Sequence, residues 1–182
     1  RDISWMSWAE PRSITADGRG VLFSRYDAGA GRDYEVGLRR LDASSAVRLG
    51  SGEALQFSPD GTRALAIVYS APRQLMVLPA GAGEPRSLTM DGFDYVSAGW
   101  HPDGRRVIFV AERQGQPLSA YIQDAAGGAP TRLGVNLVPF DPRIRNWGSL
   151  LISPDGKWFT GSEGPPTLLA VDGSGPRAGA IL

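Results

Sequence analysis

The sequence contains a reverse turn ending in Asp-Gly that occurs four times, and this repeat limits the possible folds more than any other feature. The turns are Thr15-Ala16-Asp17-Gly18, Ser58-Pro59-Asp60-Gly61, His101-Pro102-Asp103-Gly104 and Ser153-Pro154-Asp155-Gly156. Their aspartates are separated by 43, 43 and 52 residues. Periods in the forties are typical of the four-stranded blades of a β-propeller. We therefore expect about four blades.

Each repeat unit also contains the strands that such a blade needs. Proline presets the first turn position and glycine accepts a positive φ, so the turn reverses the chain between two strands. The stretch that follows is continuously apolar, as in 64–69 and 107–110, which is typical of a strand covered on both faces. A second apolar strand and a polar edge strand come next. The fold is thus predicted to be all-β, with structural roles for Asp17, Gly18, Asp60, Gly61, Asp103, Gly104, Asp155 and Gly156.

The repeat spacing also predicts how residues 1–182 divide into a single propeller region. The expected blades are approximately 10–50, 53–92, 94–134 and 148–182, with 135–147 as an insertion. Residues 1–9 are expected to form a strand of a preceding blade or a closing strand. Four blades are the lower limit for a closed ring, and we expect an open arc, a fragment of a larger propeller. Exposed blade edges of an arc would permit self-association.

Composition excludes several classes of function. With 19 basic and 19 acidic residues the chain has no net charge to attract nucleic acid, and without Cys it has no thiolate nucleophile or zinc-thiolate site. The longest apolar runs are only a few residues, far below the length needed to cross a membrane. We expect no nucleic-acid partner, no direct membrane insertion, no metal and no cofactor.

The sequence also lacks a recognisable catalytic set. His101 is the single histidine, and it occupies the position that Ser58 and Ser153 fill in other repeats, which favours a turn residue over a general base. A Gly-x-Ser-x-Gly nucleophile elbow is absent. We therefore expect no catalytic, cofactor-binding or metal-binding residue and no enzymatic activity within this chain.

The insertion offers the best candidates for contact with a protein or peptide partner. Loops carry function more often than strands do, and tryptophan is enriched among binding anchors. Trp147 is the leading candidate, and Arg143 and Arg145 precede it in the same segment. Trp100 and Trp158 lie at predicted strand positions and are expected in the core.

The Ser-Pro-Asp-Gly turn, with a basic residue close behind and an apolar strand after it, resembles the repeats of the TolB-like, WD-repeat-like bacterial propeller family. The resemblance covers about Pro11 to Leu182, and three of the four turns keep Pro-Asp-Gly, whereas the first has Ala16 in place of proline. Segments 1–8, 36–42, 48–50 and 81–86 are similar to propellers appended to bacterial serine/threonine protein kinases and sensor proteins. Kinase signatures are absent, so no kinase activity is implied.

This resemblance implies a non-catalytic protein-binding, scaffolding or sensor module of a larger bacterial protein. An alternative interpretation is that the chain is the gating propeller of a prolyl oligopeptidase-like peptidase, or of another hydrolase, whose catalytic domain is outside this chain. The family implies a periplasmic or extracytoplasmic location, and the residues leave a cytoplasmic one open.

Overall fold

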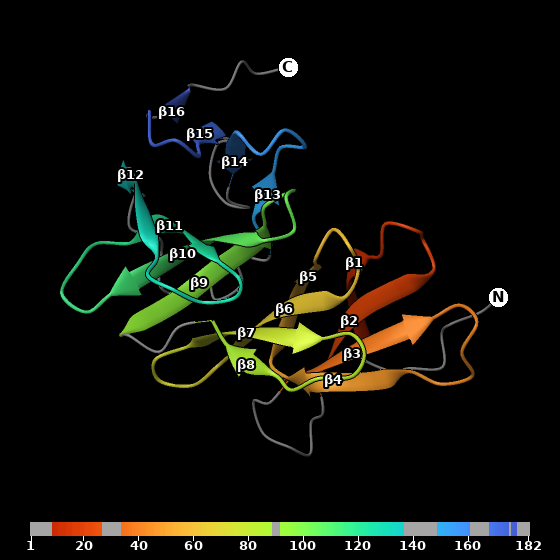
Figure 1. The fold of residues 1–182 in the computed structure, drawn as a ribbon. Helices are drawn as coiled ribbons and strands as arrows, with labels where there is room; N and C mark the ends of the chain where they lie inside the picture. The colour runs from red at the N-terminus through yellow and green to blue at the C-terminus, as the bar shows by residue number, and fades with distance from the viewer. Residues whose placement is uncertain are drawn as a thin grey trace.

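The computed structural model describes residues 9–26, 34–88, 92–136, 149–160, 168–174 and 176–177, with the side chains of 134–136 and 176–177 left aside. These residues form antiparallel β-sheets, and no helix occurs among them. There are four sheets of four strands each, which follow one another round an arc (Figure 1). The predicted all-β propeller of four blades, open rather than closed, is confirmed.

Each blade consists of four consecutive strands that pair in chain order. The first blade contains β1 Ala9–Ile14, β2 Gly20–Tyr26, β3 Tyr34–Arg40 and β4 Val47–Ser51. The second contains β5 Glu53–Phe57, β6 Arg63–Val68, β7 Gln74–Pro79 and β8 Arg86–Ser87. The third contains β9 Phe93–Trp100, β10 Arg106–Arg113, β11 Ser119–Asp124 and β12 Thr131–Asn136. The fourth contains β13 Leu151–Ile152, β14 Trp158–Thr160, β15 Leu168–Ala170 and β16 Pro176–Arg177.

The second strand of each inner blade is apolar over its buried residues, 64–67 in β6 and 107–111 in β10, because both of its faces are covered there. In β6, Leu65 and Ile67 pack toward the third blade, whereas Ala64 and Ala66 pack toward the first. Successive side chains of a strand point to opposite faces, so a strand enclosed by two blades needs apolar residues at every position. The same division in β10 places Val107, Phe109 and Ala111 toward the second blade, and Ile108 and Val110 toward the fourth.

The hydrophobic core accordingly consists of three clusters, one at each junction between successive blades. The junction of the second and third blades is the most aromatic. Its rings have centroids 5.0–5.9 Å apart, and they belong to Phe93, Tyr95, Phe109 and Tyr121. Trp100 is buried there, as the sequence predicts. Trp158 is only half-buried, because its neighbour Phe159 takes the face of β14 that packs on the third blade.

The face of the fourth blade that points away from the third carries exposed apolar side chains. Leu151 is 64% exposed and Leu168 is 42% exposed. Both alternate with residues of the blade junction, since Ile152 and Leu169 pack against the third blade. The described residues leave this sheet face uncovered.

The inner strands of the last three blades lie against one another near the axis of the arc. Ser149 forms a parallel bridge with Ala98 of β9, and its hydroxyl donates a hydrogen bond to the carbonyl of Leu55 in β5 over 2.7 Å. The Leu150 amide donates to the Ala98 carbonyl over 3.1 Å. A Cβ added at Gly99 would lie 2.6 Å from the Leu150 carbonyl oxygen. Glycine at this position therefore permits the close approach of the third and fourth blades.

We predict that Gly99→Ala destabilises the chain by about 2 kcal/mol, because the added methyl must push the Leu150 backbone away from β9. Urea denaturation followed by circular dichroism measures the loss. Gly81→Ala is the matched control, since a Cβ at Gly81 meets nothing within 4 Å and the residue has no positive φ. This control is expected to stay within about 0.5 kcal/mol of the parent. Equal losses for both variants would contradict the role assigned to Gly99.

Candidate functional site

The contact residues that the sequence favours, Trp147, Arg143 and Arg145, lie outside the described residues. The predicted turn residues are described, and each Asp-Gly pair lies in a tight turn that joins the first strand of a blade to the second. The four turn glycines have φ values of +68°, +68°, +68° and +70°. A positive φ of this size favours glycine, because other residues are strained there.

A hydroxyl group, as well as the aspartate, holds the turn together. In the second blade the Ser58 hydroxyl donates to Asp60 Oδ1 over 2.5 Å and accepts from the Arg63 amide over 3.0 Å. Asp60 Oδ1 also accepts from the Thr62 amide over 3.0 Å. The Gly61 amide donates to the Ser58 carbonyl over 2.8 Å. These bonds satisfy the backbone groups that a reversal of the chain leaves without strand partners.

The same bonds recur in the first and fourth blades. Thr15 donates to Asp17 over 2.5 Å and accepts from the Gly20 amide over 2.8 Å. In the fourth blade the Ser153 hydroxyl donates to Asp155 over 2.5 Å and accepts from the Trp158 amide over 3.0 Å. The role of these hydroxyls is not among the predictions from the sequence, although a Ser or Thr lies two residues before the aspartate in three of the repeats.

These hydrogen bonds hold the turn aspartates in the ionised form. The Ser58 hydroxyl and the Thr62 amide lower the pKa of Asp60 to about 2. The pKa values of Asp17 and Asp155 are lowered by the corresponding hydroxyls and then by backbone amides. Each carboxylate is thus engaged within its own turn. Over the described part of the chain, no three acidic or histidine side chains gather as metal ligands would.

His101 replaces the hydroxyl in the third blade and changes the bonding. Its Nδ1 accepts from the Asp103 amide over 3.2 Å, and its Nε2 lies 3.2 Å from the carbonyl oxygen of Gly156 in the next blade. The Arg106 amide turns instead to Asp103 Oδ1, at 3.0 Å. Neither ring nitrogen reaches a hydroxyl that could serve as a nucleophile among the described residues. The imidazole therefore links two blades.

The pKa of Asp103 lies well below its ordinary value. Partial burial would raise this pKa, but hydrogen bonds from the Arg106 amide, the Arg106 side chain and the Arg105 amide outweigh it. The Arg106 Nε donates to Asp103 Oδ2 over 2.6 Å. The Asp103 carboxylate is therefore held within its turn although the hydroxyl is lacking.

The turns of successive blades touch, so that they form one continuous row, the turn face. Arg63 Nη2 donates to the Gly104 carbonyl over 2.7 Å, and its guanidinium lies 4.7 Å from the ring centroid of Trp100. A Cβ at Gly61 would lie 3.6 Å from the Thr15 side chain. One at Gly156 would lie 2.3 Å from His101 Nε2. The turn residues thus also act as contacts between blades.

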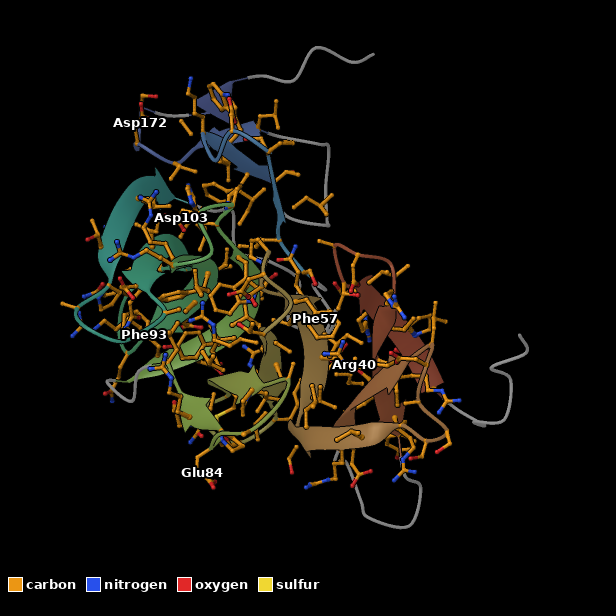
Figure 2. All side chains as sticks on the ribbon, turned by 45° about the vertical axis from the view of Figure 1, so that its right-hand side comes forward. Arg40, Phe57, Glu84, Phe93, Asp103 and Asp172 are labelled. Carbon is orange, nitrogen blue, oxygen red and sulfur yellow. The ribbon has the colours of Figure 1, made fainter. Side chains whose placement is uncertain are left out.

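Two hollows open on the turn face at equivalent junctions. One of about 460 Å³ lies between the first two blades and is lined by residues that include Thr15, Asp17, Arg40, Asp60 and Ala80. The other, of about 670 Å³, lies between the last two blades, and its lining includes His101, Arg106, Asp155, Lys157 and Asp172. Figure 2 labels Arg40 at the first hollow and Asp172 at the second. Both carry charges of each sign, which suits polar contacts with a partner.

A second polar cluster lies at the opposite ends of the strands and also joins the first two blades. Glu53 is 3% exposed, and its carboxylate accepts hydrogen bonds from the Arg12 guanidinium and from the Tyr69 hydroxyl. Burial raises the pKa of Tyr69, and the neighbouring Glu53 carboxylate raises it further. Nothing in the sequence indicates this cluster, because Arg12 and Glu53 are 41 residues apart and meet only when the blades dock.

We expect Ser58→Ala to cost about 1 kcal/mol at neutral pH, because the Asp60 carboxylate and the Arg63 amide each lose a partner. Ser58→Thr, which keeps the hydroxyl, is expected to lose less. The low pKa of Asp60 contributes stability above pH 4, and this contribution disappears as the pH falls toward 2. The difference between parent and Ser58→Ala should therefore shrink over that interval in urea denaturation. A pH-independent difference would argue against the assigned bond.

Removal of Arg12 should be far more costly than removal of an exposed arginine. Arg12→Met leaves the buried Glu53 carboxylate without its counterion, and we expect a loss of about 3 kcal/mol. The double variant Arg12→Met/Glu53→Gln should recover part of this loss. Arg25→Met is the control, since it breaks an ion pair with Glu35 whose side chains are 46% and 28% exposed, and it should cost less than about 1 kcal/mol. Similar losses in the two single variants would contradict the prediction.

Comparison with known proteins places this geometry in a recognisable fold. No family model and no curated protein matches the sequence. The structure is similar to TolB from Acinetobacter baumannii, with a TM-score of 0.69 and 20% identity over 92% of this chain and 42% of that one. It is similar to a structure assigned as TolB from Agrobacterium tumefaciens, with a TM-score of 0.64 and 23% identity over 92% of this chain and 60% of that one.

A puromycin-hydrolyzing peptidase from Mycobacterium tuberculosis is a third structural neighbour. Its TM-score is 0.60 at 12% identity, over 90% of this chain and 26% of that one. The chain thus spans less than two thirds of the length of each of these proteins. None of the described residues forms a helix that could span a membrane. The shared feature is the architecture, and the chain has the β-propeller fold of the TolB-like type, as an open arc of four blades.

Proposed function

We propose that this chain is a non-catalytic protein-binding module, a scaffolding or sensor propeller, within a larger bacterial protein. The proposal rests on the observation that the reactive groups of the turn face already form hydrogen bonds within the protein. The hydroxyls, carboxylates and the one imidazole of the turns are bonded within the turns or across blade junctions. Groups held in this way build a stable surface and are not free to transfer protons or attack a substrate.

The surface that remains suits recognition of a protein or peptide. The blades are joined by three packed cores, so loops and side chains at both ends of the strands are held on a rigid support. The turn face supplies two polar hollows of mixed charge. We retain Trp147, with Arg143 and Arg145, as proposed contacts in the insertion. Its tryptophan would act as an anchor and its arginines as charged neighbours.

A second function is the gating propeller of a peptidase or other hydrolase. The likeness to the puromycin-hydrolyzing peptidase favours it, because that similarity covers 90% of this chain. In that case the nucleophile, base and orienting acid would belong to a domain encoded elsewhere in the same gene. The sequence on either side of residues 1–182 separates the two functions. A Gly-x-Ser-x-Gly elbow followed by Asp and His would favour the hydrolase.

Selection of peptides on the purified chain tests the proposed function directly. A library of random twelve-residue peptides displayed on phage is panned against the immobilised chain, and enriched peptides are synthesised and titrated by fluorescence anisotropy. We expect peptides that bind saturably with micromolar affinity and compete with one another. We also expect no turnover of peptide or aminoacyl substrates. A selection that enriches no binding peptide, or turnover abolished by changing one residue of this chain, would overturn the proposal.

A further inference from the structure

Three tyrosine rings lie in a row where the first two blades meet, at the ends of the strands away from the turn face. The ring centroids of Tyr26 and Tyr34 are 5.5 Å apart, and those of Tyr34 and Tyr69 are 5.9 Å apart. Tyr26 is 42% exposed and Tyr69 is 39% exposed, while Tyr34 between them is half-buried. We call these three residues, together with the neighbouring Glu10, the tyrosine surface.

The position of this surface follows from the strand order. Tyr26 ends β2, Tyr34 begins β3, and Tyr69 directly follows β6. An Asp-Gly turn lies just before β2 and another just before β6, so Tyr26 and Tyr69 lie at the opposite ends of these strands from the turns. Tyr34 lies beside Tyr26. The tyrosine surface is therefore separate from the two hollows of the turn face.

One hydrogen bond and the strand register hold these rings in place. The Tyr69 hydroxyl donates to the buried Glu53 carboxylate, which also accepts from Arg12. Tyr26 and Tyr34 are direct partners in the register of β2 and β3, which brings their rings together. A surface ordered before binding loses less conformational entropy when a partner arrives.

Among the described residues, the tyrosine surface and the ion pairs beside it carry a net negative charge. The Arg12 guanidinium is shared between Glu53 and Glu10, so two carboxylates are balanced by one cation. The Glu10 side chain is 62% exposed, and Arg12 donates to only one of its oxygens, Oε2, over 2.6 Å. The nearby Arg73 is already paired with both carboxylate oxygens of Asp94, at 2.8 and 2.9 Å. The negative charge of Glu10 is thus only partly neutralised by the described residues, and it can attract a cationic side chain of a partner.

Exposed aromatic faces next to an incompletely neutralised carboxylate form a site for an organic cation. A guanidinium attracts the negative face of a tyrosine ring, and its planar fork can at the same time donate to a carboxylate. An acidic segment would be repelled by Glu10, and a purely apolar one would displace water from the carboxylate oxygen to which Arg12 does not donate, without replacing its hydrogen bonds. The surface chemistry therefore favours arginine among the side chains of a partner.

We propose that the tyrosine surface binds an extended, arginine-bearing segment of a partner protein, with the guanidinium placed over the Tyr26 and Tyr34 rings and hydrogen-bonded to Glu10. This inference rests on the proposed function as a protein-binding module. It adds the location of one contact and the chemistry of the partner.

The test uses a labelled peptide, acetyl-Gly-Ser-Arg-Gly-Arg-Ser-Gly-amide, titrated into the chain at low ionic strength by fluorescence anisotropy. The same peptide with citrulline in place of arginine has nearly the same shape without the charge. We expect the arginine peptide to bind at least tenfold more tightly. Tyr26→Ala and Glu10→Gln should each weaken its binding about two- to fivefold, as expected for exposed cation–π and ion-pair contacts. Added salt should weaken it further.

Two control variants keep the result specific to this surface. Val47→Ala removes an apolar side chain that is 57% exposed, and Glu84→Gln removes an exposed negative charge on the second blade (Figure 2). Neither belongs to the tyrosine surface, and neither should change the binding of the arginine peptide. Circular dichroism and thermal unfolding establish that all four variants are folded.

The outcome separates failure of this inference from failure of the proposed function. Equal binding of the arginine and citrulline peptides, or equal effects of the surface and control variants, would overturn the inference. If peptides selected from the phage library still bind saturably in that case, the chain remains a binding module that uses another surface. If neither selected nor arginine peptides bind, both proposals fail together.

Discussion

The hydrogen bonds that close the Asp-Gly turn are the interaction on which the rest of each blade depends, and in three of the blades they include a bond from a hydroxyl to the aspartate two residues later. In the Ser58 turn these bonds close the hairpin and fix which residue of β6 faces which neighbour. Because side chains alternate along a strand, a slip of one residue would exchange the two buried faces of that strand. In β6 this slip would put leucine and isoleucine where alanines now pack against the first blade. Turn chemistry and core packing are therefore coupled.

The third blade shows how one substitution redistributes these bonds without loss of the turn. His101 leaves the Arg106 amide to Asp103, and its Nε2 reaches the Gly156 carbonyl of the fourth blade. The fourth blade has short described strands, of two or three residues. Its attachment depends on this contact, on the Ser149 and Leu150 bonds to the inner strands, and on one apolar cluster. Because the sheet of the fourth blade is small, the contact between turns contributes a larger share of the interactions that attach this blade.

Sequence reasoning succeeds here where the information is local and repeated, and fails where it depends on docking. The turns, the all-β class and the doubly buried strands follow from residue order, because each motif folds from neighbours along the chain. The Arg12–Glu53 pair and the Gly99–Leu150 contact join residues about 40 to 50 positions apart, and the residue types alone do not predict that they meet. The turn hydroxyls form an intermediate case, since Thr15, Ser58 and Ser153 occupy one repeat position whose role becomes clear only from the geometry.

Residues that obey the repeat explain the fold, so those that depart from it are the better guide to function. The third strands of the first three blades begin with Tyr34, Gln74 and Ser119, and only the first places an aromatic ring there. The second strands end with Tyr26, Val68 and Arg113. Nothing in the blade architecture requires tyrosines at these positions, because the other blades fold without them. Aromatic side chains that are exposed and not needed by the repeat are best explained by contact with a partner.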